Sequence, residues 1–494
     1  MNSKSRPICL AVTLSLTSLN VAVGADLRLI DAIRNSDKAA VRELAKQRAD
    51  VNASQPDGST ALHWAVYEDD KEAVELLIKA GARVDAPNEY GATPLWLACT
   101  EGHADLIDLL LRAGADPNLA LHTGETPLMT ASRTGNVAAV KRLLVAGAKV
   151  NAKESSRSQT ALMWAISERH PDVTALLLEF GADVRARTSV RKMLVNSGPD
   201  GILRLTSDRT DLFEEEQGGF TPLLFAARVG DAQSAKLLLE KGAKANETAP
   251  MGATPLVVAA HSGQDEVALV LLDHGADANA ADAGYTALHA AIRRSDFDLV
   301  TALLAHGANP NAVLTKSTPV RRGSQDWAFD PVWVGATPMW LAAKLTDPAI
   351  MRALAQAGAD PRLPGKDGAS VLMAVFAGGP GRRPVGNATR DPKDVERDTL
   401  ETLKTALELG VDVNAPNAAG DTPMHMAALR KSNTYVQFLA EHGAKLDLKN
   451  KKGQTPLVLA QSRPNAYLAA TLVDYDPARG AATADLLRKL GATE

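Results

Sequence analysis

A segment of 33 residues recurs along most of the chain, and this period limits the possible folds more than any other feature of the sequence. Each copy carries a glycine just before a Thr-Pro pair, a Thr-Ala pair or an equivalent, and serine replaces the glycine in one copy. The motif is found at Gly58, Gly91, Gly124, Ser158, Gly219, Gly252, Gly284, Gly335, Gly368, Gly420 and Gly453. This spacing predicts one elongated solenoid in place of the several globular domains that 494 residues would otherwise suggest.

The copy at residues 91–123 predicts two short helices and a turn. Thr93 can cap the first helix through its hydroxyl, and Pro94 fits the first helical position, where its missing N–H costs nothing. Gly102 is expected to end this helix, because glycine adopts a left-handed conformation at low cost. The second helix has apolar residues over too wide an arc for one buried stripe, namely Leu106, Ile107, Leu109, Leu110 and Leu111. Such a pair needs cover on two sides, so we expect it to stack on its own copies.

The motif resembles the signature of the ankyrin repeat family, which is TPLHxA in a unit of about 33 residues. Versions in this chain are TALHWA at 60–65, TPLWLA at 93–98, TALHAA at 286–291 and TPMHMA at 422–427. The resemblance implies an all-α ankyrin repeat solenoid, with about 11 repeats after a degenerate N-terminal cap, a concave inner face and extended fingers between repeats. It also implies that this surface binds another protein without catalysis, and that His63, His289 and His425 make internal hydrogen bonds.

Residues 1–25 depart from the repeat and are typical of a secretory signal peptide. Lys4 and Arg6 precede an apolar run, and small residues lead to a predicted cleavage between Ala25 and Asp26. A retained membrane anchor is the alternative, although the run of about 16 residues is short for a membrane span and contains polar side chains. The leader and the repeats together resemble exported bacterial ankyrin repeat proteins, so we expect a periplasmic or secreted chain without a membrane span after cleavage.

The boundaries of the remaining segments are predicted from the places where the 33-residue spacing is kept and where it is interrupted. Residues 26–57 are expected to form the N-terminal capping repeat, whose outer side is polar. Ankyrin repeats are predicted at 58–190, 219–312 and 335–494, separated by inserted fingers at 191–218 and 313–334. Within the last block, loop insertions are predicted at 378–397 and 463–481, and a closing cap helix at 484–490.

The sequence contains no arrangement that is typical of catalysis or of metal binding. No HExxH, GxSxG, Walker or GxGxxG motif with its structural context is present, and no cysteine–histidine cluster has ligand spacing. Cys99 replaces an alanine of a first helix and is expected to be a small buried hydrophobe. We therefore predict no catalytic residue, no cofactor, no metal and no small-molecule substrate. An accessory subunit of an exported enzyme, or an enzyme with a site built from the inserted loops, is the alternative.

Charge and aromatic residues indicate what kind of partner to expect. The formal net charge of −4 becomes −6 once the leader with its two basic residues is removed, so we do not expect nucleic acid as a partner. Aromatic residues make up only 4% of the chain, yet three of them fall within the second finger. The predicted partner-binding residues are Arg321, Arg322, Asp326, Trp327, Phe329 and Trp333, since arginine and aromatic side chains dominate binding energetics. The alternative is that these rings fold back and seal the solenoid.

Tryptophans also occur in four first helices, as Trp64, Trp96, Trp164 and Trp340. We expect them to pack in the core or between repeats. Trp96 and Trp340 replace the usual histidine of the motif and could instead line the inner face.

Overall fold

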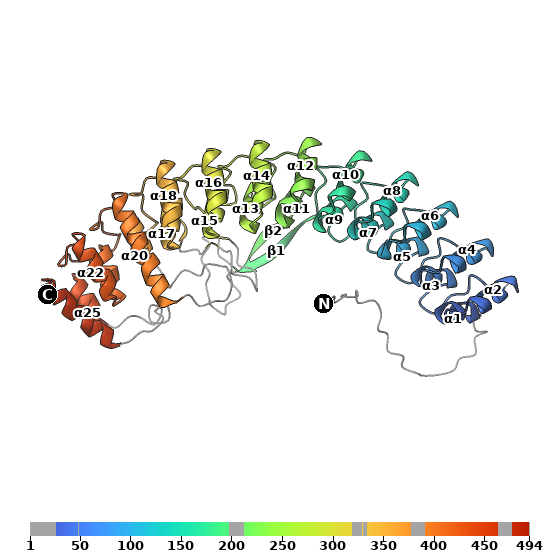
Figure 1. The fold of residues 1–494 in the computed structure, drawn as a ribbon, viewed down its shortest axis with the longest axis horizontal. Helices are drawn as coiled ribbons and strands as arrows, with labels where there is room; N and C mark the ends of the chain where they lie inside the picture. Colours follow the sequence, from blue (N-terminus) through green and yellow to red (C-terminus); the bar gives the residue numbers. More distant parts are fainter. Residues whose placement is uncertain are drawn as a thin grey trace.

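The protein is an arch of stacked helix pairs (Figure 1). The computed structural model describes residues 26–47, 49–196, 212–318, 329, 333–376, 391–462 and 477–493. These residues form 24 helices, which pack as twelve consecutive pairs, and two strands. The predicted all-α solenoid of about 11 repeats and an N-terminal cap is confirmed. Residues 1–25, where the signal peptide is predicted, lie outside the described residues.

The first helices form the inner layer of the arch and the second helices form its outer layer (Figure 1). The first helices are α1 (Arg28–Arg34), α3 (Ala61–Tyr67), α5 (Pro94–Glu101), α7 (Pro127–Thr134), α9 (Ala161–Ser167), α11 (Pro222–Val229), α13 (Pro255–Ser262), α15 (Ala287–Arg293), α17 (Pro338–Lys344), α19 (Val371–Ala374), α21 (Pro423–Leu429) and α23 (Pro456–Gln461). The second helices are α2 (Lys38–Lys46), α4 (Lys71–Lys79), α6 (Ala104–Arg112), α8 (Val137–Val145), α10 (Pro171–Glu179), α12 (Ala232–Glu240), α14 (Asp265–Asp273), α16 (Phe297–Ala305), α18 (Pro348–Gln356), α20 (Pro392–Glu408), α22 (Asn433–Glu441) and α25 (Pro477–Lys489).

The ends of α5 show why these short helices begin and end where they do. The hydroxyl of Thr93 accepts a hydrogen bond from the Trp96 backbone N–H at 3.2 Å, and Pro94 occupies the first helical position. Gly102 ends the helix with a φ of 72°, in the left-handed region that glycine adopts cheaply. Both predicted signals are confirmed.

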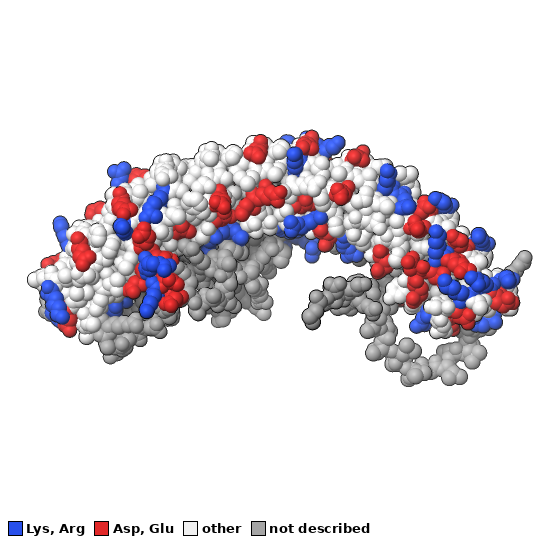
Figure 2. All heavy atoms as spheres, viewed as in Figure 1, with Lys and Arg blue, Asp and Glu red and all other residues white. Residues whose placement is uncertain are grey.

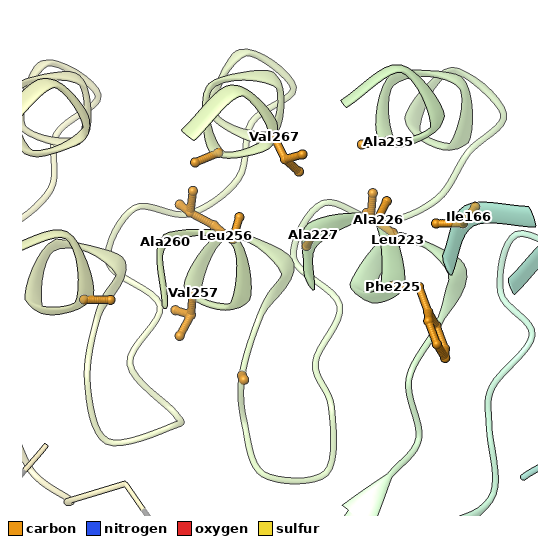
Figure 3. Close-up of a cluster of buried hydrophobic side chains, with 14 of the residues drawn as sticks. Ile166, Leu223, Phe225, Ala226, Ala227, Ala235, Leu256, Val257, Ala260 and Val267 are labelled. Carbon is orange, nitrogen blue, oxygen red and sulfur yellow. The ribbon is translucent and has the colours of Figure 1, made fainter. Parts of the chain in front are cut away.

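The core lies between the two helix layers and is continuous along the arch. Figure 3 shows Leu256 and Ala260 of α13 beneath Val267 of α14, all of them buried. In α6, Leu106, Ile107 and Leu110 are also buried, since α6 packs against both its own first helix and the neighbouring second helices. Burying such a side chain contributes about 1.5 to 3 kcal/mol. A single pair cannot bury both sides of its second helix, so the fold depends on stacking.

Seven asparagine side chains each tie one repeat to the next. Asn118 donates from Nδ2 to the Gly147 carbonyl at 3.2 Å and accepts at Oδ1 from the Lys149 N–H at 2.8 Å. The same two bonds are made by Asn52, Asn151, Asn246, Asn279, Asn311 and Asn414. All of them except Asn52 come four residues after the closing glycine of a second helix, and Asn52 follows α2, which ends without a glycine.

The inserted finger at 191–218 contains a β-hairpin that the sequence did not lead us to expect. Strand β1 (Val190–Asn196) pairs antiparallel with β2 (Leu212–Gly218), with Val190 opposite Gly218 and Asn196 opposite Leu212. The hairpin extends from the inner layer into the hollow of the arch (Figure 1).

Two predicted loop boundaries are wrong. Helix α20 begins at Pro392, inside the predicted loop 378–397, because Asp391 caps it by accepting from the Lys393 N–H at 2.9 Å and proline fits the first position. Helix α25 begins at Pro477, inside the predicted loop 463–481, and runs through the closing cap helix that was predicted to start at residue 484.

Candidate partner-binding face

The concave face is formed by the sides of the first helices that point away from the second helices, together with the fingers. In Figure 3, Phe225 of α11 and Val257 of α13 point away from the second helices, toward this face. Phe225 is buried although it points outward, because Phe220 and Arg228 cover it. On this part of the concave face, the surface is therefore formed by Phe220 and Arg228, which lie over the helix residue Phe225.

Arginine side chains stack on aromatic rings at four places along this face. Each arginine stands seven residues after the residue that caps its first helix, so all four occupy the same register of the repeat. The distances from guanidinium carbon to ring centroid are 4.7 Å for Arg34 over Trp64, 5.3 Å for Arg133 over Trp164, 4.7 Å for Arg228 over Phe225 and 5.3 Å for Arg293 over Trp333. Separations under about 6 Å are attractive.

These stacks hold arginine side chains in place on a face that a partner can reach. Arg34 and Arg133 are exposed and have no ion-pair partner among the residues that the structure describes. A guanidinium that is already ordered loses less conformational entropy when it binds, and it can donate two parallel hydrogen bonds to a carboxylate. Sequence reasoning missed these stacks. The sequence feature that could have predicted them is an arginine seven residues after the capping residue of a first helix, with an aromatic residue in the same or the next repeat.

The predicted aromatic finger is only partly within the described residues. Phe329 is completely buried, its ring centroid lies 4.7 Å from that of Tyr285, and its N–H donates to the Thr318 hydroxyl at 2.8 Å. Trp333 is half-buried beneath Arg293. For these two rings the structure matches the alternative in which they fold back onto the solenoid, and a buried Phe329 cannot contact a partner directly. Arg321, Arg322, Asp326 and Trp327 lie outside the described residues.

Two of the four tryptophans of the first helices contact the preceding repeat, since Arg34 lies over Trp64 and Arg133 lies over Trp164. Trp64 is half-buried and donates from Nε1 to the Gln55 side-chain oxygen at 2.9 Å. Trp96 and Trp164 are also half-buried. Trp340 is only 6% exposed and belongs to the core, so it does not line the inner face as it could have done.

The three motif histidines are structural. His63 accepts at Nδ1 from the Thr60 N–H at 3.1 Å and donates from Nε2 to the Ala92 carbonyl of the next repeat at 3.0 Å. His425 repeats this arrangement with the carbonyl of Gln454. Burial lowers the pKa of all three histidines, and for His289 to about 4. All three are therefore neutral near pH 7, and His63 and His425 hold neighbouring repeats together.

Other candidate groups also have structural explanations. Cys99 is completely buried, and burial raises the pKa of its thiol. A cavity of about 260 Å³ lies between the fingers that precede α7 and α9, and Glu154 and Trp164 line it. Burial disfavours the charged form of Glu154, but hydrogen bonds from the backbone N–H groups of Gln159, Ser156 and Arg157 outweigh this effect and lower its pKa. Through these hydrogen bonds, Glu154 stabilises the backbone of the finger that precedes α9.

Within the described ranges, no three histidine, cysteine, aspartate or glutamate residues gather as metal ligands. No described helix is long and apolar enough to cross a membrane. On the face of the arch that Figure 2 shows, lysine and arginine are interspersed with aspartate and glutamate, without a continuous patch of either sign.

Comparison with known families agrees with the helix pairs and the motif. The family described as "Ankyrin repeats (3 copies)" matches residues 29–120, 114–188, 192–282, 223–314 and 394–480, which is well over half of the chain. The chain belongs to the ankyrin repeat family. Ankyrin repeats are protein–protein interaction modules, so this ankyrin repeat protein has an interaction role.

Curated relatives share parts of this ankyrin array. The E3 ubiquitin-protein ligase KEG of Arabidopsis thaliana is 26% identical over 274 residues, which cover 53% of this chain and 17% of KEG. Rabankyrin-5 of Mus musculus is 32% identical over 74 residues, or 15% of this chain and 6% of that protein. The palmitoyltransferase ZDHHC17 of Homo sapiens is 32% identical over 95 residues, or 19% and 15%. The chain spans less than a fifth of the length of these relatives.

Proposed function

We propose that this ankyrin repeat protein is an exported, non-catalytic scaffold that binds a protein partner across its concave face. The observation that carries the proposal is the set of arginine side chains stacked on aromatic rings along that face. Arginine and tryptophan are the residue types that contribute most at protein interfaces, and both are held here in defined positions. The burial of Cys99 and the hydrogen bonds of His63 and His425 give these three candidate reactive groups structural roles, which favours a scaffold over the alternative of an enzyme.

The location is part of the same proposal. The predicted signal peptide at residues 1–25 supports export to the periplasm or the medium, with Asp26 as the first residue of the mature chain. Fractionation of the source cells with N-terminal sequencing of the protein tests this point. Recovery of a chain that begins at Asp26 outside the cytoplasm supports export, and a cytoplasmic chain that retains residues 1–25 contradicts it.

Binding can be tested with a pair of variants in the same repeat. Arg133→Ala removes an exposed arginine from the concave side, and Lys141→Ala removes an exposed lysine from the second helix α8 of that repeat. The unmodified protein and both variants would be used to capture partners from an extract of the source organism, after circular dichroism shows equal helix content. We expect Arg133→Ala to weaken capture of one specific protein by about tenfold, equivalent to about 1.4 kcal/mol, and Lys141→Ala to leave it unchanged. Equal loss in both variants, or in neither, would contradict binding through the concave face.

A further inference from the structure

The arginine–tryptophan stacks at Trp64 and Trp164 differ at the indole N–H. Nε1 of Trp64 donates to the Gln55 side-chain oxygen at 2.9 Å. Nε1 of Trp164 is buried and has no hydrogen-bond partner among the residues that the structure describes. The buried Nε1 atoms of Trp96 and Trp340 also lack partners there, but these two residues stand one position earlier in the motif, in place of the histidine. Because buried polar groups are nearly always paired in folded proteins, the N–H of Trp164 is a donor that an added acceptor can use.

The cause of this difference lies in the finger before each helix. Gln55 and Glu154 occupy the same position, since the N–H of Gln55 donates to the Ser59 carbonyl at 2.9 Å and that of Glu154 to the Gln159 carbonyl at 3.1 Å. The side chain of Glu154, however, accepts from three backbone N–H groups of its own finger at 2.5, 2.7 and 3.0 Å. It therefore holds the finger together and makes no hydrogen bond to the indole of Trp164.

The cavity of about 260 Å³ between the fingers that precede α7 and α9 borders this indole. Besides Trp164, the side chains that matter for its chemistry are Glu125, Glu154, Arg157 and Gln159. A single water needs only about 10 to 15 Å³, so the cavity has room for a side chain. Oε1 of Glu125 accepts from the Thr130 hydroxyl at 2.8 Å, and a carboxylate can accept about four hydrogen bonds. The cavity thus combines a donor on Trp164 with an acceptor on Glu125.

The charges around the cavity favour a neutral ligand. Glu125 and Glu154 oppose an acidic one, and Glu154 is charged near pH 7 because its hydrogen bonds outweigh the effect of burial and lower its pKa. Two guanidinium groups oppose a basic ligand, since Arg133 lies over the Trp164 ring at 5.3 Å and Arg157 lines the cavity. A carboxamide is neutral, and it has both a carbonyl oxygen that accepts and an NH₂ group that donates.

We propose that this cavity binds a glutamine side chain of the protein partner. The carbonyl oxygen of that side chain accepts from Nε1 of Trp164, as the Gln55 oxygen does from Trp64, and its NH₂ group donates to the Glu125 carboxylate. The inference rests on the proposed function, because it names a side chain of the partner that binds beside the stack of Arg133 on Trp164.

The test uses the full chain labelled with nitrogen-15 at tryptophan, and the N-acetyl N-methylamide derivatives of glutamine, glutamate and lysine as probes. NMR shows the indole N–H signals, and Trp64→Phe and Trp164→Phe assign two of them by their loss. We expect the glutamine derivative to move the Trp164 signal downfield in a saturable way and to bind about tenfold more tightly than the other two. The Trp64 signal is the control and should stay in place, since Gln55 already accepts from it.

Three results of this titration would overturn the proposal: no movement of the Trp164 signal, equal movement of both signals, or equal or tighter binding of a charged derivative. Glu125→Gln tests the second hydrogen bond, because it keeps the acceptor of the Thr130 hydroxyl and removes one negative charge. We expect this variant to lower the preference for glutamine over glutamate about threefold. An unchanged preference would contradict the pairing with Glu125.

Capture of the partner from extract separates this inference from the proposed function. Trp164→Phe keeps a ring beneath Arg133 and removes the N–H, and Trp64→Phe is the matched change in the equivalent stack. We expect Trp164→Phe to weaken capture about fivefold and Trp64→Phe to leave it unchanged. Equal loss in both would assign the effect to the rings and overturn the inference. If Trp164→Phe retains the partner while Arg133→Ala loses it, the inference fails and the proposed function stands. If both retain it, both fail.

Discussion

The described parts of the two inserted fingers are held in different ways, although both insertions follow a second helix of the solenoid. In the finger at 191–218, β1 and β2 pair through their own backbones and the hairpin projects into the hollow. In the finger at 313–334, Phe329 is buried against Tyr285 of the solenoid. Backbone pairing leaves a finger projecting with a side available for binding, whereas a buried aromatic side chain makes the finger part of the core.

The largest expected effect comes from removing the aromatic anchor. Phe329→Ala deletes a completely buried ring, and such changes cost about 3 to 5 kcal/mol. We expect faster hydrogen exchange in α15 and α17, which flank this finger, and a lower unfolding temperature. The control is Val190→Ala at the base of β1, where the side chain is 48% exposed and little change is expected. Equal effects of the two substitutions would mean that Phe329 does not hold the second finger.

Features that depend on a few neighbouring residues could be predicted from the sequence. The Thr93 cap and the Gly102 stop are of this kind, because each is set by the backbone within one helix. The start of α20 was missed although Asp391 and Pro392 carry a local signal, since the Gly- and Pro-rich residues before them favoured a long loop. The period predicts an elongated solenoid, and the resemblance of the motif to the ankyrin signature implies its all-α class.

The candidate site was less predictable because its contacts join different repeats. The stacking of Arg133 on Trp164 depends on how α7 and α9 are placed relative to one another, which one repeat does not specify. The burial of Phe329 likewise depends on Tyr285. Aromatic residues in a polar insertion therefore could not be assigned to a partner or to the core from composition.

Acid should loosen the repeats beside the aromatic finger more than the base of the hairpin. Burial lowers the pKa of His289 in α15 to about 4, so the unfolded chain binds a proton near pH 6.5 that the folded chain takes up only near pH 4. Stability is therefore lost as pH falls through this window, by about 3 kcal/mol in total. Near the hairpin, burial raises the pKa of Glu247, so the folded chain binds this proton at a higher pH than the unfolded chain. The contribution of Glu247 to stability therefore increases as the pH falls, opposite to that of His289.

Hydrogen exchange at pH 7 and pH 4.5 checks this difference. We expect amides of α15 to lose protection on acidification relative to those of α11, which begins beside Thr221, the hydrogen-bond partner of Glu247. The control His289→Gln has a neutral side chain that does not titrate in this range, so its α15 amides should show a shallower pH dependence. Parallel loss in both helices of the unmodified protein would contradict the assignment.

Different side chains connect the repeats on either side of each finger, so we expect different substitutions to lower the stability at the two places. Asn311 joins the repeat before the aromatic finger to Gly358 and Asp360, with distances of 3.2 and 2.8 Å. At the hairpin, the corresponding position is Arg185, and Arg187 instead donates from Nη1 to the carbonyls of Gly219 and Thr248 at 2.8 and 2.9 Å. Asn311→Ala should cost about 1 to 2 kcal/mol in chemical denaturation, because it leaves a carbonyl and an N–H without partners. Asn118→Ala, in an uninterrupted part of the array, is the control and should cost the same.

The smallest effect is expected at the hairpin itself, from the ion pair between Lys192 and Glu214. The two charged groups lie 3.1 Å apart, and both side chains are exposed, so water and salt screen their attraction. If the hairpin is held by its backbone hydrogen bonds, Lys192→Ala should leave the hydrogen-exchange protection of the amides of β1 and β2 unchanged at any ionic strength. Hydrogen exchange at low and high salt is the measurement. Loss of protection at low salt would show that side-chain charge holds the hairpin, and the two fingers would then both depend on side chains.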